Sequence, residues 1–339
     1  MIQDAIALLV GNDEVTREQA RQVAEEILNG QATACQIAAF ITALRIRGET
    51  GDHILAFAET LREHSVHIEK PNNVDVVLDT CGTGGDASGT FNVSTAAAII
   101  ASAAGVCVAK HGNRAMSSSC GSADVLAELG VNINAPAAVS QRCLREIGLC
   151  FLFAPAYHAA MKHAAAPRRE VGIRTIFNMI GPLSNPAGAT HQLIGVYAPE
   201  LTETFAQVLH ELGAERALVV HGSDGIDEVT TTSVTQVTEL LGGRIHTWIV
   251  SPDDFGITPT SVENLVVGSV AEAAAEMRNV LRGQTGPRAD MALVNAGAAL
   301  YVAGKAPSIV DGYELAAKTV ASGKAVEKLK ALVEMTNAA

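Results

Sequence analysis

Residues 74–86 read VDVVLDTCGTGGD, and this stretch decides the fold of the chain. The mainly apolar residues 74–78 predict a buried strand, and a glycine-rich loop from Asp79 to Asp86 follows it. Three glycines in four residues remove the Cβ atoms that would keep backbone N–H groups away from an anion. After the loop, Ser94 and Thr95 open an alanine-rich helix whose positive N-terminal end favours phosphate. The stretch predicts a phosphate-binding loop between strand and helix, and a tight turn without a ligand is the alternative.

The glycine loop differs from two common nucleotide-binding loops. A P-loop ends on Gly-Lys-Ser/Thr, and a dinucleotide-binding loop reads GxGxxG. Neither order occurs in residues 82–87. Asp86 adds a carboxylate directly after the glycines, so a phosphate bound here needs a cation or ribose hydroxyls beside it.

Composition and charge narrow the class of protein. The 339 residues are 48% apolar and 18% charged, which is enough for a large buried core. The net charge of −12 and the absence of a basic run disfavour nucleic acid and anionic membranes as partners. We find no signal peptide and no membrane-spanning segment. The six cysteines include no CxxC pair and indicate free thiols in a reducing compartment, so we expect a cytoplasmic protein.

The first part of the chain is expected to form a small all-helical domain, residues 1–72. Thr16 with Gln19 and Thr33 with Gln36 are capping boxes, and each precedes an amphipathic helical pattern. These short helices bury little surface by themselves, so we expect them to pack on the rest of the chain or on a second subunit. A further helical contribution is expected from about residues 165–185.

The remainder, residues 73–339, alternates between short apolar runs and helical stretches. This alternation predicts a large α/β domain with a mainly parallel central sheet. Ligands bind such sheets at the carboxyl ends of the strands, where the candidate loops lie. The expected strands are residues 74–78, 106–109, 150–153, 193–196, 217–220 and 245–249.

A second loop, Lys110-His111-Gly112-Asn113-Arg114, follows the expected strand 106–109. Its lysine and arginine supply positive charge and a planar fork of donors for phosphate oxygens. Three serines and Gly121-Ser122 follow, and the latter opens another helix. Two phosphate-binding helix starts favour a ligand that is phosphorylated at two places. A solvated basic turn is the alternative.

A third loop, residues 221–228, ends on the adjacent acids Asp227 and Glu228. Carboxylate oxygens are hard ligands, and magnesium needs few of them when substrate phosphates and water complete its octahedron. We therefore expect magnesium bound here on a phosphorylated substrate, with Asp86 and the Ser94 hydroxyl able to contribute. A solvated acidic turn is the alternative.

Taken together, these motifs resemble those of the anthranilate phosphoribosyltransferases of tryptophan biosynthesis, and the resemblance runs along the whole chain. Pyrimidine nucleoside phosphorylases share the architecture, but the motifs at residues 110–114 and 181–186 favour the anthranilate enzymes. The motifs are Gly82-Thr83-Gly84-Gly85-Asp86 with Asn92-Val93-Ser94-Thr95, Lys110-His111-Gly112-Asn113-Arg114, Gly172-Ile173-Arg174-Thr175 with Asn178, Gly181-Pro182-Leu183-Ser184-Asn185-Pro186, and Asp224-Gly225-Ile226-Asp227-Glu228.

The resemblance implies the substrates, metal and site residues. The substrates would be 5-phosphoribosyl 1-pyrophosphate (PRPP) and anthranilate, with magnesium, two ions per site, on Ser94, Asp227 and Glu228. Anthranilate would meet Gly82, His111, Asn113, Tyr157, His158 and Arg168, and the neighbouring Arg169 is a second candidate for its carboxylate. PRPP would meet Gly82, Gly85, Asp86, Thr90, Asn92, Val93, Ser94, Thr95, Lys110, His111, Gly112, Asn113, Arg114, Ser117, Ser118 and Ser122. A homodimer through the helical domain is also implied.

The implied reaction needs little covalent help from the protein. Pyrophosphate leaves C1 of the ribose, and the anthranilate amine, which carries a lone pair at neutral pH, attacks that carbon. We expect positioning and electrostatic stabilisation to dominate and no single histidine to be indispensable. A nucleoside phosphorylase and a non-catalytic nucleic-acid-binding relative are the alternatives, and the net charge of −12 speaks against the second.

Overall fold

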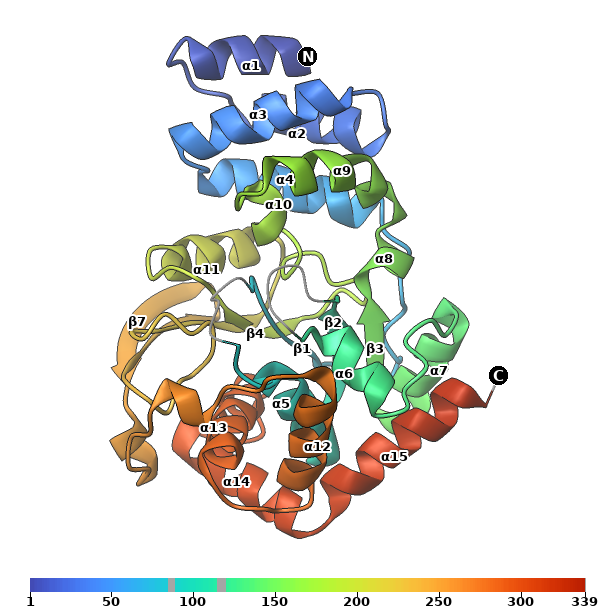
Figure 1. The fold of residues 1–339 in the computed structure, drawn as a ribbon, viewed down its shortest axis with the longest axis vertical. Helices are drawn as coiled ribbons and strands as arrows, with labels where there is room; N and C mark the ends of the chain where they lie inside the picture. The colour runs from blue at the N-terminus through green and yellow to red at the C-terminus, as the bar shows by residue number, and fades with distance from the viewer. Residues whose placement is uncertain (85–88, 115–119, 339) are drawn as a thin grey trace.

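The computed structural model describes residues 1–84, 89–114 and 120–338. A bundle of helices lies at one end, a twisted sheet crosses the middle, and a second layer of helices closes the other end (Figure 1). The strands are β1 (Val77–Gly82), β2 (Cys107–Gly112), β3 (Leu149–Phe153), β4 (His191–Gly195), β5 (Arg216–Gly222), β6 (Thr235–Leu241) and β7 (Arg244–Val250). The α-helices are α1 (Ile2–Val10), α2 (Arg17–Leu28), α3 (Ala34–Arg47), α4 (Gly51–Glu63), α5 (Val93–Ala103), α6 (Ser122–Glu128), α7 (Ala137–Ile147), α8 (Ala154–Tyr157), α9 (Lys162–Val171), α10 (Ile176–Met179), α11 (Leu201–Glu211), α12 (Val270–Leu281), α13 (Pro287–Val302), α14 (Ile309–Ala321) and α15 (Lys324–Asn337).

The sheet has the order β3-β2-β1-β4-β5-β6-β7 within the described residues. Strands β3, β2, β1, β4 and β5 are parallel, and β6 and β7 pair antiparallel at one edge. This confirms the expected α/β class with a mainly parallel sheet. Because side chains alternate across a strand, Leu193 and Leu218 enter the core beneath α5 and α12–α15, whereas Ile194 and Val219 enter the core shared with α11 and the bundle.

Three strands extend into residues that we expected in loops, among them β5, which continues through His221 to Gly222. Strand β1 also begins at Val77 and not at residue 74. Strand β1 continues to Gly82, which pairs with Gly195, so the glycine loop begins after Gly82 and not at Asp79. Strand β2 likewise contains Lys110 and His111, which we expected in a loop. The polar side chains suggested loop ends, but they are buried and have polar partners inside the protein, which allows the strands to continue.

Strand β6 was missed because its polar residues disguise a buried strand. Glu239 pairs with Arg216 of β5 at 2.9 Å, and the Thr238 hydroxyl bonds to Thr202 of α11 at 2.9 Å. Because Glu239 and Thr238 have these hydrogen-bonding partners, they can lie at buried strand positions where an alternating hydrophobic pattern would have apolar residues.

The helical bundle begins with the predicted caps. Thr16 with Gln19 and Thr33 with Gln36 both form complete capping boxes, and a third box that we did not predict joins Thr50 to His53. Helices α9 and α10 pack against α2, α3 and α4, so the segment 162–179 lies beside helices more than 100 residues earlier (Figure 1).

All six cysteines are free, and five of them are buried while Cys35 is exposed. In the parts of the chain that the structure describes, no helix is long and apolar enough to cross a membrane.

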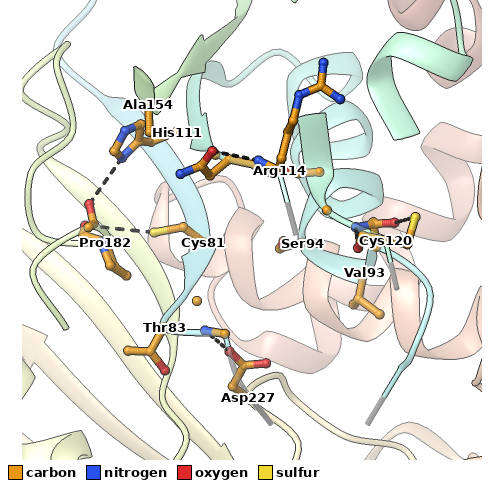
Figure 2. A pocket seen from close by; sticks show the side chains of 18 of the residues that line it. Cys81, Thr83, Val93, Ser94, His111, Arg114, Cys120, Ala154, Pro182 and Asp227 are labelled. Atoms are coloured by element: carbon orange, nitrogen blue, oxygen red, sulfur yellow. Dashed lines mark hydrogen bonds between the residues drawn. The ribbon is translucent and has the colours of Figure 1, made fainter. Parts of the chain in front are cut away.

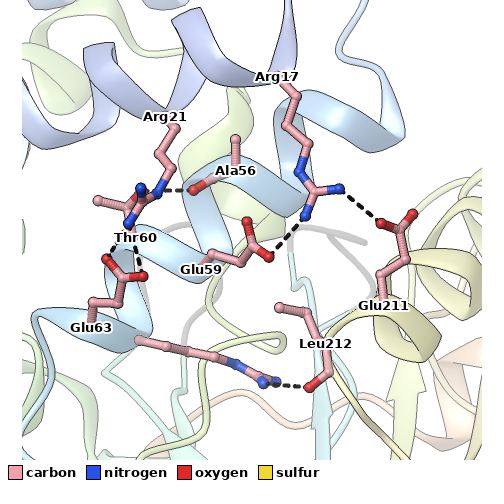
Figure 3. Close-up of polar contacts among 9 residues, drawn as sticks. Arg17, Arg21, Ala56, Glu59, Thr60, Glu63, Glu211 and Leu212 are labelled. Atoms are coloured by element: carbon pink, nitrogen blue, oxygen red, sulfur yellow. Dashed lines mark hydrogen bonds and ion pairs between the residues drawn. The ribbon is translucent and has the colours of Figure 1, made fainter.

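Arg62 of α4 holds the bundle to the α/β layer. Its Nε donates to the Leu183 carbonyl at 2.7 Å and its Nη1 to the Leu212 carbonyl at 3.1 Å. Burial lowers the pKa of Arg62 to about 10. Arg17 bridges Glu59 of α4 and Glu211 of α11, while Arg21 pairs with Glu63 (Figure 3).

We expect Arg62→Met to lower the free energy of unfolding by about 1–3 kcal/mol for each carbonyl left unpaired. Arg21→Met is the matched control, because its ion pair with Glu63 is exposed and such pairs contribute at most about 1 kcal/mol. Urea unfolding of both variants measures the difference. Equal losses would show that Arg62 does not join the two layers.

Candidate active site

A cavity of about 320 Å³ opens at the carboxyl ends of β1 and β2. The glycine loop, the start of α5 and the acidic loop line one side, and α9 and α10, which pack on the helical bundle, line the other with the segment after α10 (Figure 1). Figure 2 shows Thr83 with Asp227 apart from His111 with Pro182. Expected site residues that line it are Gly82, Thr90, Asn92, Val93, Ser94, Lys110, His111, Gly112, Asn113, Arg114, Ser122, Arg168, Asp227 and Glu228.

The backbone N–H groups on the first side already hold carboxylates. Gly84 N donates to Asp227 Oδ2 at 2.8 Å, and Ser94 N, in the first turn of α5, donates to Glu228 Oε1 at 3.1 Å. N–H groups of a glycine loop and of a helix N-terminus suit an anion. Two of the chain's own carboxylates therefore occupy donors suited to phosphate oxygens.

Two glycines allow the acidic loop to approach this closely. A Cβ on Gly195 would lie 1.5 Å from the Asp227 carbonyl oxygen, and one on Gly82 would lie 2.6 Å from Asp227 Oδ2. Asp227 and Glu228 thus project hard oxygen atoms beside the glycine loop. These residues fit magnesium, which accepts few protein carboxylates when phosphates and water complete its shell. Among the described residues, no group of three or more acidic, histidine or cysteine side chains is placed to hold a metal ion.

Lys110 is buried beneath the same side. Its ammonium donates to the Thr80 carbonyl at 2.6 Å and to Ser94 Oγ at 3.2 Å. It therefore fixes the hydroxyl at the start of α5 from below. Burial lowers the pKa of Lys110, and the nearby Asp79 carboxylate opposes that change.

The third group of expected residues lies at the start of α6. Arg114 pairs with Asp124 of α6 at 2.5 Å, and its backbone N–H donates to Asn113 Oδ1 at 2.7 Å. A Cβ on Gly112 would lie 2.3 Å from Ser122 Oγ, so glycine lets β2 meet this helix closely.

An arginine marks the opposite side of the cavity. The guanidinium of Arg168 lies over the ring of Phe177, 5.5 Å from its centroid, and burial lowers its pKa. Arg169 is exposed and does not line the cavity. A guanidinium next to an aromatic ring suits a planar aromatic carboxylate.

Two histidines, His111 and His158, pack together next to the cavity. His111 lines the cavity, its Nδ1 lies 3.2 Å from the Gly181 carbonyl, and its ring centroid is 5.0 Å from that of His158. Burial and then the second histidine lower the pKa of His111 to about 3, and burial lowers that of His158 to about 4. Both rings are therefore neutral at physiological pH.

These shifts predict a loss of stability on acidification. Below pH 6.5 the unfolded chain takes up a proton at each histidine that the folded chain refuses, so stability falls by up to about 1.4 kcal/mol per pH unit for each. Urea unfolding between pH 7 and pH 5 should show a smaller slope in His111→Asn than in the wild type. The exposed His246 provides the control variant His246→Asn. Equal slopes in the His111 variant and the wild type would contradict the prediction.

Some expected residues lie elsewhere. Tyr157, His158 and Thr95 are buried and do not line the cavity; His158 lies behind His111. Gly85, Asp86, Ser117 and Ser118 lie outside the described residues. Lining residues absent from our set of site residues include Phe91, Cys120, Ala154, Phe177, Asn178 and Pro182. Asn178 and Pro182 belong to motifs of the resemblance, whereas no sequence signal marked the other four.

Comparison with known proteins defines the class that this fold and cavity belong to. Residues 3–65 match the model described as "Glycosyl transferase family, helical bundle domain", and residues 74–326 match "Glycosyl transferase family, a/b domain". The chain is therefore a member of this glycosyl transferase family.

Full-length relatives make the identification narrower. The anthranilate phosphoribosyltransferase of Moorella thermoacetica is 48% identical over 98% of both chains. The crystal structure of the Thermus thermophilus enzyme matches with a TM-score of 0.92 and 40% identity, over 98% of this chain and 99% of that one. The structure of the Saccharomyces cerevisiae enzyme in complex with PRPP and Mg matches with a TM-score of 0.91 and 26% identity, over 100% of this chain and 98% of that one. The chain belongs to the anthranilate phosphoribosyltransferases.

Proposed function

We propose that this chain transfers the phosphoribosyl group of PRPP to the amine of anthranilate, giving N-(5-phosphoribosyl)anthranilate and pyrophosphate in tryptophan biosynthesis. The observation that carries the proposal is the two-sided cavity. N–H donors and the carboxylates of Asp227 and Glu228 lie on one side, and the Arg168 guanidinium over Phe177 lies on the other.

PRPP would lie on the side of the glycine loop. The N–H groups of Gly84 and Ser94 are suited to the pyrophosphate, and the segment from Asn113 to Ser122 is suited to the ribose 5-phosphate. In this arrangement the N–H groups stabilise charge that develops on the leaving pyrophosphate. Removal of one such donor in other enzymes costs about 3–4 kcal/mol of transition-state stabilisation.

Magnesium would be held by Asp227, Glu228 and the Ser94 hydroxyl, and it would neutralise charge on the pyrophosphate. We propose two ions per site, as the resemblance to the anthranilate phosphoribosyltransferases implies.

Anthranilate would lie on the side of Arg168. A bidentate contact with the guanidinium would hold its carboxylate, and Phe177 and Pro182 would border its ring. His111, whose pKa is lowered to about 3, is too weak a base to take a proton from the attacking amine at neutral pH. This supports a role for His111 in positioning the acceptor.

The direct test is anthranilate fluorescence against time. We expect it to decrease only when the chain, PRPP and magnesium are all present, and to stay constant after chelation of the metal. Phosphorolysis of thymidine or uridine, with no turnover of anthranilate, would favour a nucleoside phosphorylase instead.

We further propose that residues 1–72, with the helices of 165–185, form one domain and residues 73–339 the other, as the packing of α9 and α10 on the bundle supports.

We also propose a homodimer through the helical domain, because Val10 of α1 and Ile46 of α3 are 76% and 79% exposed. Light scattering measures the mass. The free thiols suit a cytoplasmic enzyme.

A further inference from the structure

Asp79 is a buried acid in the middle of β1 that the proposed chemistry does not use. Its side chain is 0% exposed and does not line the cavity, so it contacts neither substrate. Its Oδ1 accepts the His111 N–H at 3.0 Å, and its Oδ2 accepts the Asn185 side-chain N–H at 2.7 Å. A buried carboxylate is costly unless it is paired and hydrogen-bonded, so its position calls for an explanation.

The partners of Asp79 lead to the wall of the cavity on the Arg168 side. We call residues 181–186 the acceptor wall, because Gly181 and Pro182 line the cavity. Asn185 Nδ2 donates to Asp79 and also to the Ala109 carbonyl at 2.8 Å. The acceptor wall is thereby attached to both β1 and β2.

His111 is attached to the same wall. Its backbone N–H donates to Asp79 and its Nδ1 lies 3.2 Å from the Gly181 carbonyl. The carboxylate of Asp79 therefore holds both ends of one connected path, which runs from His111 through Gly181 and the acceptor wall to Asn185.

The other side of the cavity is close by. Lys110 is 3% exposed, and Asp79 is the leading favourable charge for its ammonium among the described residues. That ammonium donates to Ser94 Oγ, at the start of α5. One carboxylate behind the cavity thus supports groups on both of its sides.

We propose that Asp79 is a positioning residue that sets the acceptor wall and His111 at the spacing that anthranilate requires. The proposal rests on the proposed function, because it assigns anthranilate to the side of Arg168. It assigns Asp79 no contact with substrate and no proton transfer.

The test begins with Asp79→Asn, which keeps the shape of the side chain. The new amide can still accept from His111 N–H, but its NH₂ then faces the NH₂ of Asn185, and two donors repel. We expect the KM for anthranilate to rise about tenfold or more, as the loss of a charged hydrogen bond implies.

The reciprocal exchange, Asp79→Asn with Asn185→Asp, restores a donor opposite an acceptor and keeps one buried negative charge. The exchange loses the bond to the Ala109 carbonyl, which then faces a carboxylate oxygen. We therefore expect the double variant to recover the KM for anthranilate in part, to a value at least about threefold below that of Asp79→Asn. Thr60→Val is the control, because Thr60 is a buried residue of α4 whose hydroxyl donates to the Ala56 carbonyl of the same helix.

A folded Asp79→Asn with an unchanged KM for anthranilate would overturn the proposal, and so would a folded double variant that recovers nothing. If Asp79→Asn does not fold, Asn185→Ala replaces it, because it removes the side-chain donor to Asp79 and leaves the carboxylate in place. We expect the same rise in KM, and an unchanged value would overturn the proposal.

A crystal structure of Asp79→Asn separates this inference from the proposed function. We expect the contact between His111 Nδ1 and the Gly181 carbonyl to be broken in the variant. An intact wall would overturn the inference even in a chain that uses anthranilate. If the acceptor wall is displaced in the variant but the wild-type protein does not turn over anthranilate, the inference is supported and only the proposed function is contradicted.

Discussion

Asp227→Asn combined with Glu228→Gln is expected to reduce kcat/KM for PRPP by at least about a thousandfold. Each carboxylate supports charge on the leaving pyrophosphate, and one such interaction is typically worth a factor of about 10²–10³. Steady-state rates of anthranilate consumption at saturating magnesium measure the loss.

Two controls make that result specific. Asp224→Asn removes an acid of the same loop whose carboxylate bonds to Thr230 and to the Ile226 N–H and does not line the cavity. His111→Ala removes the histidine that lines the cavity. We expect both to retain far more activity, and a His111→Ala loss as large as that of the double variant would contradict electrostatic and positional catalysis.

Without metal, the same double variant should bind pyrophosphate more tightly than the wild type. In the wild type, the carboxylates occupy the N–H groups of Gly84 and Ser94. Neutral amides compete with an anion less strongly and do not repel it, so metal-free pyrophosphate should bind more tightly to the variant than to the wild type. Calorimetry with magnesium should show the reverse order. Weaker binding by the variant under both conditions would contradict this competition.

Arg168→Met is expected to raise the KM for anthranilate by about 10- to 150-fold, since a hydrogen bond to a charged group contributes about 1.5–3 kcal/mol. The KM for PRPP should change much less, because Arg168 belongs to α9, which packs on the helical bundle, whereas Asp227 and Glu228 contact the glycine loop and the start of α5. Methionine keeps an apolar side chain against Phe177.

Arg169→Met is the matched control for that prediction. Its guanidinium is adjacent in sequence, but it is exposed and does not line the cavity. We expect its KM for anthranilate to equal that of the wild type. A larger effect at Arg169 than at Arg168 would assign the substrate carboxylate to the other arginine.

Local sequence signals predicted the elements that depend on few residues. The boxes at Thr16 and Thr33 begin α2 and α3 as expected, and the glycine loop does lead into α5. Here one or two side chains bond to backbone groups within three residues, so the sequence contains the whole interaction.

Polar residues with distant partners were harder to place. From the sequence alone, Asp79 is interpreted as the start of a loop. Its hydrogen-bond partner Asn185 lies 106 residues later, and the pattern along the chain does not indicate that they are in contact. Glu239 within β6 depends in the same way on Arg216 of the neighbouring strand. A pattern of polarity along the chain does not contain these pairings, so the strand ends and β6 were mispredicted.

The candidate site was predictable where glycines and charges lie at strand ends. Ser94, Lys110, Asp227 and Glu228 come together as their positions in successive β–α units imply. Phe177 and Ala154 are ordinary apolar residues, and only the packing of α10 on the bundle and the position of α8 after β3 bring them to the cavity.

The most direct measurement is a crystal structure with PRPP, a divalent cation and benzoate, which has the carboxylate of anthranilate and lacks its amine. Manganese in place of magnesium would locate and count the ions by anomalous scattering. We predict pyrophosphate oxygens on the N–H groups of Gly84 and Ser94, with Asp227 and Glu228 moved onto the metal and benzoate on Arg168. Pyrophosphate away from these N–H groups, or benzoate away from Arg168, would contradict the two-sided site.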